Sequence, residues 1–229
     1  TVGDRKLISC SPVVGAMRVR WHGHSCFEFW DADNTVVVDP HDGRSIGIKP
    51  PAVSADIVLM THNHYDHNAV RVVRGRHEDF LGRNGQFSVR GMNIEGLPTW
   101  HDAVGGAERG PNTMYLFEMD GISVCHCGDL GCIPDDDTIE RIREVDMLFV
   151  PVGETFTMPL PEVKRFLELV NPNVIVPMHY RVGGLSIPIT PLDDFLDLIP
   201  DEAVDYIGNE IDVTRDDIDG MKQCWVFDR

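Results

Sequence analysis

The first third of the chain alternates apolar and polar positions with the period of two that is typical of β-strands. The turn-forming residues Asp31, Asp33 and Asn34 separate two of these runs. A later run, DIVLM at 56–60, is almost wholly apolar, as expected for a strand covered on both faces. The pattern predicts strands at 18–21, 25–30, 35–40 and 56–60.

The remainder of the chain mixes strand-like runs with stretches of helical spacing. Strands are predicted at 86–90, 92–97, 113–119, 122–127, 147–152 and 173–180, with a final one at 203–207. Helices are predicted near 68–74 and at 138–145, 161–170 and 191–199, and a Gly-rich loop at 104–110. This order of elements favours an α/β fold in which two packed sheets are covered by helices.

Length and composition are those of a globular chain with a sizeable core. The sequence has 229 residues, of which 42% are hydrophobic, and we expect residues 17–229 to form a single domain. Residues 1–16 lack a clear pattern and are interpreted as an N-terminal lead-in. The sequence has neither an apolar stretch of roughly 20 residues nor the order of a signal peptide. We therefore expect a soluble, cytoplasmic protein with reduced cysteines.

The chain is strongly acidic, with a formal net charge of -17. Such a charge repels polyanions, and no basic patch long enough to offset it is visible in the sequence. We expect the partner to be a small-molecule substrate, and neither a long nucleic acid nor a membrane.

A cluster of metal-ligand residue types follows directly after the apolar run at 56–60. The segment THNHYDH places His62, His64, Asp66 and His67 within six positions. In a nearly extended segment, positions i and i+2 project to the same side, so His62 and His64 can grip one metal ion while the other two turn toward a second. Imidazole with some carboxylate suits zinc, manganese or iron better than calcium or magnesium.

Four ligands from one loop cannot complete two metal sites, so further ligands are needed from other strand ends. His101, Asp129 and His179 each follow a strand-like run of the sequence. Sites on α/β scaffolds are usually built at such positions. These three residues therefore complete the candidate ligand set.

Together these motifs resemble those of the metallo-beta-lactamase superfamily, and within it the lactonase-like (L-ascorbate-6-phosphate lactonase-like) branch. The HxHxDH pattern alone is typical of the superfamily, whereas the GHS, RGPNT and CGDLG elements narrow the resemblance to the branch. The similarity covers essentially residues 17–180. The matching elements are WHGHSCF (21–27), VVVDP (36–40), THNHYDHN (61–68), GGAERGPNT (105–113), HCGDLG (126–131) and PMHY (177–180).

The resemblance implies a four-layer αββα sandwich of two mixed β-sheets flanked by helices, and a homo-oligomer. It also implies two divalent metal ions, with zinc or manganese as the first choice and iron as the next. It assigns His62, His64 and His101 to the first ion, Asp66, His67 and His179 to the second, and Asp129 to a bridging position.

Five further residues are candidates for contacts with the substrate or with the metal ligands. Asp39 would orient a ligand histidine, or would simply form an Asp-Pro turn. Arg109 and Asn112 could hold an anionic substrate group, although a solvated loop arginine is the simpler interpretation of Arg109. His24 would contact substrate or metal, or be a buried hydrogen-bonded histidine. Tyr180 would donate a proton to an oxyanion, or only pack.

Two ions that share a carboxylate and a water lower the pKa of that water toward neutrality, so the ligand set predicts a metal-dependent hydrolase that uses a metal-bridged hydroxide. Asp66 and Asp129 are the candidate catalytic carboxylates, and His126 is a candidate proton donor or supporting residue. The branch resemblance implies a small lactone, ester or other acyl substrate, with or without a phosphate. The alternatives are a phosphodiesterase on small phosphodiesters, a mononuclear-iron enzyme that oxidises a sulfur compound, and a catalytically idle metal-binding protein.

Overall fold

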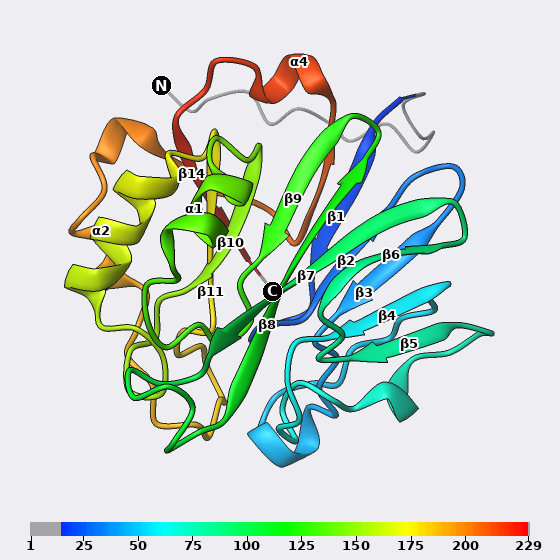
Figure 1. The fold of residues 1–229 in the computed structure, drawn as a ribbon, viewed down its shortest axis with the longest axis horizontal. Helices are drawn as coiled ribbons and strands as arrows, with labels where there is room; N and C mark the ends of the chain where they lie inside the picture. The colour runs from blue at the N-terminus through cyan, green and yellow to red at the C-terminus, as the bar shows by residue number, and fades with distance from the viewer. Residues whose placement is uncertain (1–14, 229) are drawn as a thin grey trace.

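The computed structural model describes residues 15–228, which contain two β-sheets packed face to face (Figure 1). The strands of the first sheet are β1 (Met17–Trp21), β2 (Phe27–Trp30), β3 (Thr35–Val38), β4 (Ile57–Met60), β5 (Glu78–Leu81) and β13 (Glu210–Val213). The strands of the second are β6 (Gly85–Val89), β7 (Met92–Trp100), β8 (Pro111–Met119), β9 (Ile122–His126), β10 (Met147–Pro151), β11 (Val174–Met178), β12 (Val204–Ile207) and β14 (Gln223–Phe227). The spatial orders are β13-β1-β2-β3-β4-β5 and β12-β14-β11-β10-β9-β8-β7-β6.

Alternation along the strands sends one set of side chains into the space between the sheets. In β3, Val36 and Val38 join the core between the sheets, whereas Val37 faces the opposite side and joins a smaller cluster. Aromatic rings link the two sheets, because Phe149 of β10 meets Phe27 and Phe29 of β2 at centroid distances of 4.7 and 5.1 Å. Edge-to-face contacts of this kind add specific geometry to the hydrophobic effect of burial.

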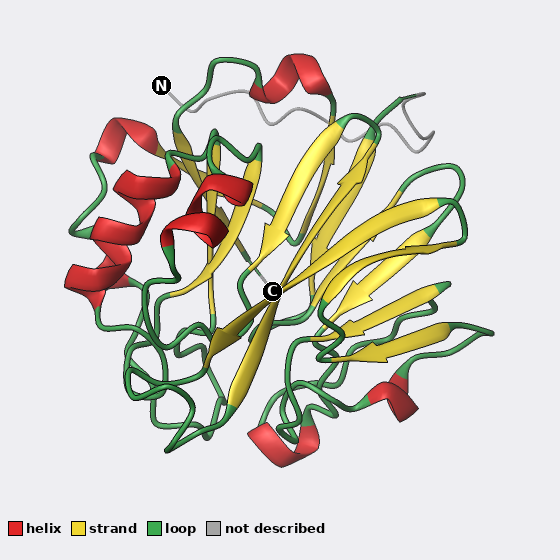
Figure 2. Ribbon diagram, viewed as in Figure 1, coloured by secondary structure: helices red, strands yellow, loops and turns green. Residues whose placement is uncertain are grey.

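Helices cover part of the outer side of the eight-stranded sheet, near β10 and β11 (Figures 1 and 2). The two longer ones are α1 (Asp136–Ile142) and α2 (Leu160–Val170), and the short ones are α3 (Asp193–Leu196) and α4 (Arg215–Ile218). The start of α1 is fixed by Asp135, whose side chain accepts a hydrogen bond from the Thr138 amide at 2.9 Å. Over residues 15–228, none of the helices has the length and apolar character needed to cross a bilayer.

The outer side of the six-stranded sheet is covered by loops and by the 3-10 turn η2 (Val70–Val72). Another such turn, η1 (Arg44–Ile46), joins a separate apolar cluster with Ile187 and Ile189. A third such turn, η3 (Asp201–Ala203), precedes β12. The expected sandwich of two mixed sheets with flanking helical segments is confirmed, with this thin layer on one side.

Several sequence expectations about single elements were wrong. The segment 68–74 contains only the single turn η2, because the chain then pairs in a strand-like manner with Ser54 through Arg74. The strand at 203–207 is not the last, since β13 and β14 follow it, and the helix expected at 191–199 is reduced to α3. The lead-in 1–16 lies outside the described residues except for its last two positions, and the single domain over 17–229 stays a prediction.

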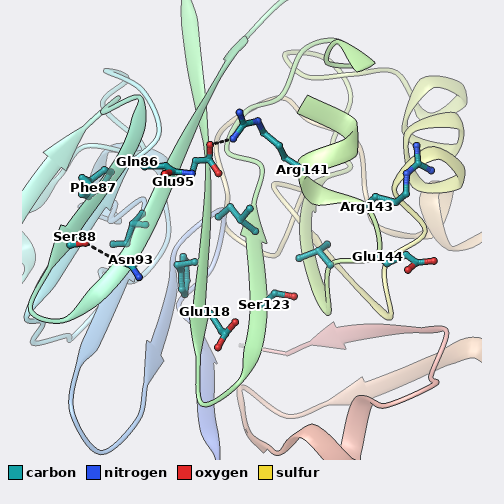
Figure 3. Close-up of a pocket in the computed structure, with 14 residues that line it drawn as sticks. Gln86, Phe87, Ser88, Asn93, Glu95, Glu118, Ser123, Arg141, Arg143 and Glu144 are labelled. Atoms are coloured by element: carbon teal, nitrogen blue, oxygen red, sulfur yellow. Dashed lines mark hydrogen bonds and ion pairs between the residues drawn. The ribbon is translucent and has the colours of Figure 1, made fainter. Parts of the chain in front are cut away.

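The helices leave the outer face of β6, β7 and β8 uncovered, and an open groove of about 770 Å³ lies there (Figure 3). Polar and charged side chains dominate its lining, and Arg141 of α1 forms an ion pair with Glu95 of β7 across it. None of the described residues that line this groove is a histidine or a cysteine. The groove is therefore separate from the candidate metal ligands.

Those ligands follow strands that run in the same direction within each sheet. In the first sheet β3 is parallel to β4, and in the second β9, β10 and β11 are parallel to one another. The loops that follow these strands meet at one edge of the sandwich, at the bottom of Figure 1. This edge contains the site.

Candidate metal centre

The loop that follows β4 is held in place by Asp39, which follows the neighbouring strand β3. The buried Asp39 carboxylate accepts hydrogen bonds from the Thr61 amide and the Thr61 hydroxyl, both at 2.8 Å. Its Oδ2 also lies 2.9 Å from Nδ1 of His67. This contact favours the His67 tautomer whose Nε2 is unprotonated and faces the centre, as expected for an orienting carboxylate.

Three strands of the second sheet bring the remaining candidate ligands to the same point. His101 follows β7, Asp129 follows β9 and His179 follows β11, and all three side chains are buried. Oδ2 of Asp129 lies 3.2 Å from Nε2 of His101, 3.3 Å from Nε2 of His179, 3.2 Å from Nε2 of His67 and 3.8 Å from Nε2 of His62. Both sheets therefore contribute to one cluster centred on this carboxylate.

The donor atoms of the cluster fit divalent cations. Buried polar atoms normally have a hydrogen-bond partner, yet Nε2 of His62, Nε2 of His67 and Oδ1 of Asp129 are buried without one. Ligand atoms that lie within 4.8 Å of one another form three groups. The groups are His62, His64 and His101; His62, His67 and Asp129; and His24, Asp66, His67 and His179.

The electrostatics of the cluster supply ionised carboxylates and, at His62, a neutral imidazole. Burial lowers the pKa of His62 to about 3, so this ring is neutral with a free lone pair near neutral pH. Burial alone would raise the pKa of Asp129, but His179 and His67 outweigh it and lower that pKa well below the usual value. His67 has a raised pKa, because Asp129, Asp66 and Asp39 together outweigh its burial. A cation bound at His67 would displace a proton there.

Two glycines of the HCGDLG turn allow the backbone to approach this cluster closely. A Cβ on Gly128, which has φ +56°, would collide with side-chain atoms of Thr61 and Asn112. A Cβ on Gly131 would collide with the backbone of His101 and Asp102. The turn that carries Asp129 is therefore packed directly against the segment that carries His101.

His24 lies within the cluster, next to Asp66 and His179. Its Nε2 lies 3.1 Å from Oδ2 of Asp66, its ring centroid lies 4.3 Å from that of His179, and its side chain is fully buried. Its Nδ1 has no hydrogen-bond partner. Three non-glycine residues of the centre adopt left-handed backbone conformations: His24 at φ 54°, Asp39 at φ 48° and His179 at φ 54°.

Asn112 holds the turn that carries Asp129 through hydrogen bonds to its backbone. Its side-chain NH2 donates to Thr99 Oγ1 at 2.8 Å and to the Cys127 carbonyl at 2.9 Å, and its Oδ1 accepts from the Asp129 amide at 3.1 Å. The side chain therefore positions the Asp129 turn and has no donor left for a substrate.

His126 and Tyr180 also have their polar atoms engaged by backbone groups. Nε2 of His126 lies 2.9 Å from the Ser25 carbonyl, and its Nδ1 accepts from the Gly128 amide at 3.2 Å. The Tyr180 hydroxyl donates to the Phe227 carbonyl at 3.3 Å. Neither side chain lines the pocket over the cluster.

That pocket has a volume of about 360 Å³ and opens above the cluster. Arg109 lines it, together with a largely apolar wall. The wall contains Tyr65, Phe156, Ile187 and Pro188. Only Tyr65 carried a sequence signal, since it lies inside the histidine motif; the other three come from loops that contain no recognisable pattern.

Comparisons with known proteins agree with this geometry. Residues 18–179 match the family model described as a beta-lactamase superfamily domain. A UPF0173 metal-dependent hydrolase of Methanopyrus kandleri is 31% identical over 72% of this chain and 84% of its own length, and one of Archaeoglobus fulgidus is 29% identical over 74% and 85%.

A solved structure from Thermotoga maritima superposes with a TM-score of 0.76, at 34% identity over 92% of this chain and 98% of that one. It is described as a candidate Zn-dependent hydrolase of the metallo-beta-lactamase superfamily. The family match covers most of the chain and includes every candidate ligand, from the loop after β4 to the residue after β11. The chain therefore belongs to the metallo-beta-lactamase superfamily.

Proposed function

We propose that this protein is a metal-dependent hydrolase that cleaves a small lactone, ester or related acyl compound. The observation that carries the proposal is the carboxylate oxygen Oδ2 of Asp129, which faces imidazole nitrogens of four histidines within 3.2 to 3.8 Å in a buried site. Hydrogen bonds among these groups cannot satisfy every lone pair, whereas bound cations would. The description of the relatives as metal-dependent hydrolases supports the same activity.

The proposed centre is dinuclear. One ion would be held by His62, His64 and His101 and the other by Asp66, His67 and His179, with His24 beside the second and Asp129 between them. Zinc or manganese suits this nitrogen-rich set, and iron is the next choice. When bound, such ions supply an activated water and polarise the carbonyl of the substrate.

The side chains of the centre supply orientation and proton handling. Asp66 lines the pocket and is held by His24, so its carboxylate is placed to accept a proton from the attacking water. His126 would stiffen the Asp129 turn through its two backbone contacts, and Asn112 would do so through its contact with the Asp129 amide. These positioning roles take the place of proton donation by His126 and substrate binding by Asn112.

Acyl substrates are favoured over phosphodiesters because of the pocket. Nuclease-like activity needs a basic channel that tracks a phosphate backbone, whereas the described lining of this pocket includes one arginine, no lysine and an apolar wall. The lactonase-like branch, a homo-oligomer, a cytoplasmic location and a single domain over 17–229 belong to the same proposal.

The test is hydrolysis of a panel of lactones, phenyl esters, thioesters and small phosphodiesters by protein that is stripped of metal and then restored with zinc, manganese or iron. Metal content per chain is measured in parallel for the wild type, Asp129→Asn and a distant control, Asp146→Asn. We expect acyl hydrolysis that requires metal, is lost in Asp129→Asn and persists in Asp146→Asn. Turnover confined to phosphodiesters would overturn the substrate class, and two bound ions without any turnover would overturn the hydrolase itself.

A further inference from the structure

The pocket over the metal centre has a polar and an apolar part. Among the described residues that line it, Arg109 is the one arginine and there is no lysine, and Tyr65, Phe156, Ile187 and Pro188 supply the apolar wall. We propose that Arg109 binds an anionic group of the substrate, so that the enzyme selects acyl compounds that carry a carboxylate or phosphate away from the scissile carbonyl. This inference rests on the hydrolase activity proposed above.

The backbone that carries Arg109 is fixed before any ligand binds. The Asp102 carboxylate accepts hydrogen bonds from the amides of Val104 (2.9 Å), Gly106 (2.7 Å), Glu108 (2.9 Å) and Arg109 (2.8 Å). Although burial would raise the pKa of Asp102, these amides lower it to about 2. A loop held in this way presents its side chain with little ordering cost on binding.

The same strand end controls both parts of the proposed substrate site. Asp102 directly follows His101, the ligand that enters from β7, and Gly131 packs against the backbone of both residues. The distance between the metal centre and the Arg109 loop is therefore set by a short rigid segment. The site would therefore select substrates whose length matches the distance between the metal centre and Arg109.

The Arg109 side chain is oriented by its neighbours, but its ion-pair partner can be replaced by a substrate anion. Its guanidinium carbon lies 5.7 Å from the Phe156 ring centroid, and its Nη1 lies 3.1 Å from Oε2 of Glu108. The side chain of Glu108 is 62% exposed, and ion pairs with such exposed partners contribute little to stability. A substrate anion inside the pocket can replace Glu108, because a guanidinium fork binds carboxylate and phosphate with two parallel hydrogen bonds.

The charge balance makes a local cation necessary for an anionic substrate. The chain has a net charge of -17, and Asp66 and Asp129 also face the pocket. Bound metal ions would offset the charge of these two carboxylates but lie at the reacting end. An anionic group at the other end would meet a repulsive field without Arg109.

Pocket size and lining narrow the substrate further. A volume of about 360 Å³ lies at the lower end of the range of small-molecule sites. The apolar wall fits a short hydrocarbon segment between the anion and the carbonyl. The expected class is a small ester or lactone of a dicarboxylic or phosphorylated acid.

The test compares phenyl hydrogen glutarate with phenyl 5-oxohexanoate, in which a neutral methyl ketone takes the place of the carboxylate, and with phenyl 3-phosphonopropanoate. Phenol release is followed for metal-restored wild type, Arg109→Gln and Arg109→Lys. Arg141→Gln is the control, since Arg141 likewise pairs with a glutamate but lines the groove of Figure 3 instead. Thermal unfolding shows whether each variant is folded.

We expect the wild type to prefer an anionic ester to the neutral one, and Arg109→Gln to reduce that preference by about 10- to 100-fold, mainly through KM. Arg109→Lys should retain part of the preference and Arg141→Gln all of it. The anionic ester whose kcat/KM falls more on substitution of Arg109 identifies the group that Arg109 binds. Hydrolysis of all three esters with a preference unchanged in Arg109→Gln would overturn this inference and leave the hydrolase standing. Absence of metal-dependent hydrolysis both of these esters and of the lactones and thioesters of the first panel would overturn the proposed function, and this inference with it.

Discussion

Replacing Asp39 by asparagine tests whether this buried carboxylate sets the orientation of His67. The substitution keeps one oxygen for the Thr61 amide but places an NH2 group opposite Nδ1 of His67, where the structure has Oδ2 at 2.9 Å. His67 would then have to accept at Nδ1 and carry its proton on Nε2, the atom that faces Asp129. The ring would lose its free lone pair toward the metal.

The magnitude follows from similar supporting contacts in metal sites. Loss of such a contact lowers metal affinity by about 10- to 100-fold, or about 1.4 to 2.8 kcal/mol. The protein itself would also lose a hydrogen bond to a charged group, which contributes about 1.5 to 3 kcal/mol to stability. The two effects are separable because only the first depends on metal.

Asp146→Asn is a matched control. Asp146 also accepts from the amide and hydroxyl of one residue, Ser123, both at 2.8 Å, but it precedes β10 and contacts no candidate ligand. We expect both variants to unfold earlier in denaturant, and only Asp39→Asn to bind zinc more weakly in a competition with a chromophoric chelator. Equal zinc affinity in the two variants would refute the argument about the His67 tautomer.

Further predictions follow from the site. His24→Ala should weaken the binding of one metal ion and leave the binding of the other unchanged, so that metal content falls toward one ion per chain at limiting metal. Loss of both ions together would contradict the separate grouping of His24 with Asp66, His67 and His179. Gly131→Ala should displace His101 through its backbone contact and reduce metal content, whereas Gly91→Ala, which meets no neighbour, should not, as mass spectrometry of the native protein would show. The folded-state pKa of Asp102, about 2, lies below the roughly 3.9 of an unfolded chain, so its contribution to stability is present above pH 4 and is lost as the pH falls toward 2. In Asp102→Asn the unfolding temperature should therefore fall less steeply between about pH 4 and pH 2 than in the wild type. An unchanged pH dependence would contradict this linkage. Removal of metal by a chelator should lower Tm, and restoring metal should raise it in proportion to the logarithm of its free concentration.

The strands that follow a simple pattern were predictable, and those shaped by distant contacts were not. The strands β1 and β2 alternate apolar and polar residues because one face of each packs on the second sheet. The strands β3 and β4 are apolar runs because their second face joins another buried cluster, and both patterns are visible in the sequence. In β5 the run EDFL carries charges on exposed positions and has no alternation. The residues of β14, QCWVF, are buried because they insert between β11 and β12 late in the chain, which no local signal indicates.

The candidate ligands were predictable because they combine rare residue types with strand ends. The structure brings His62, His101, Asp129 and His179 together as expected. The supporting residues were harder, since the role of an asparagine or histidine depends on which backbone groups reach its polar atoms. For His126 those groups are the Ser25 carbonyl and the Gly128 amide, which are distant from each other in the sequence.

The left-handed backbone at His24, Asp39 and His179 has a consequence for how this protein can change over time. A side chain with a Cβ in that conformation is strained, by about 1 kcal/mol or more at each position, and glycine would relieve the strain. Each position therefore sets the chemistry of the site against the stability of the fold. At Asp39, however, glycine would remove that strain together with the hydrogen bonds to Thr61 and His67, so loss of activity alone would not favour glycine there.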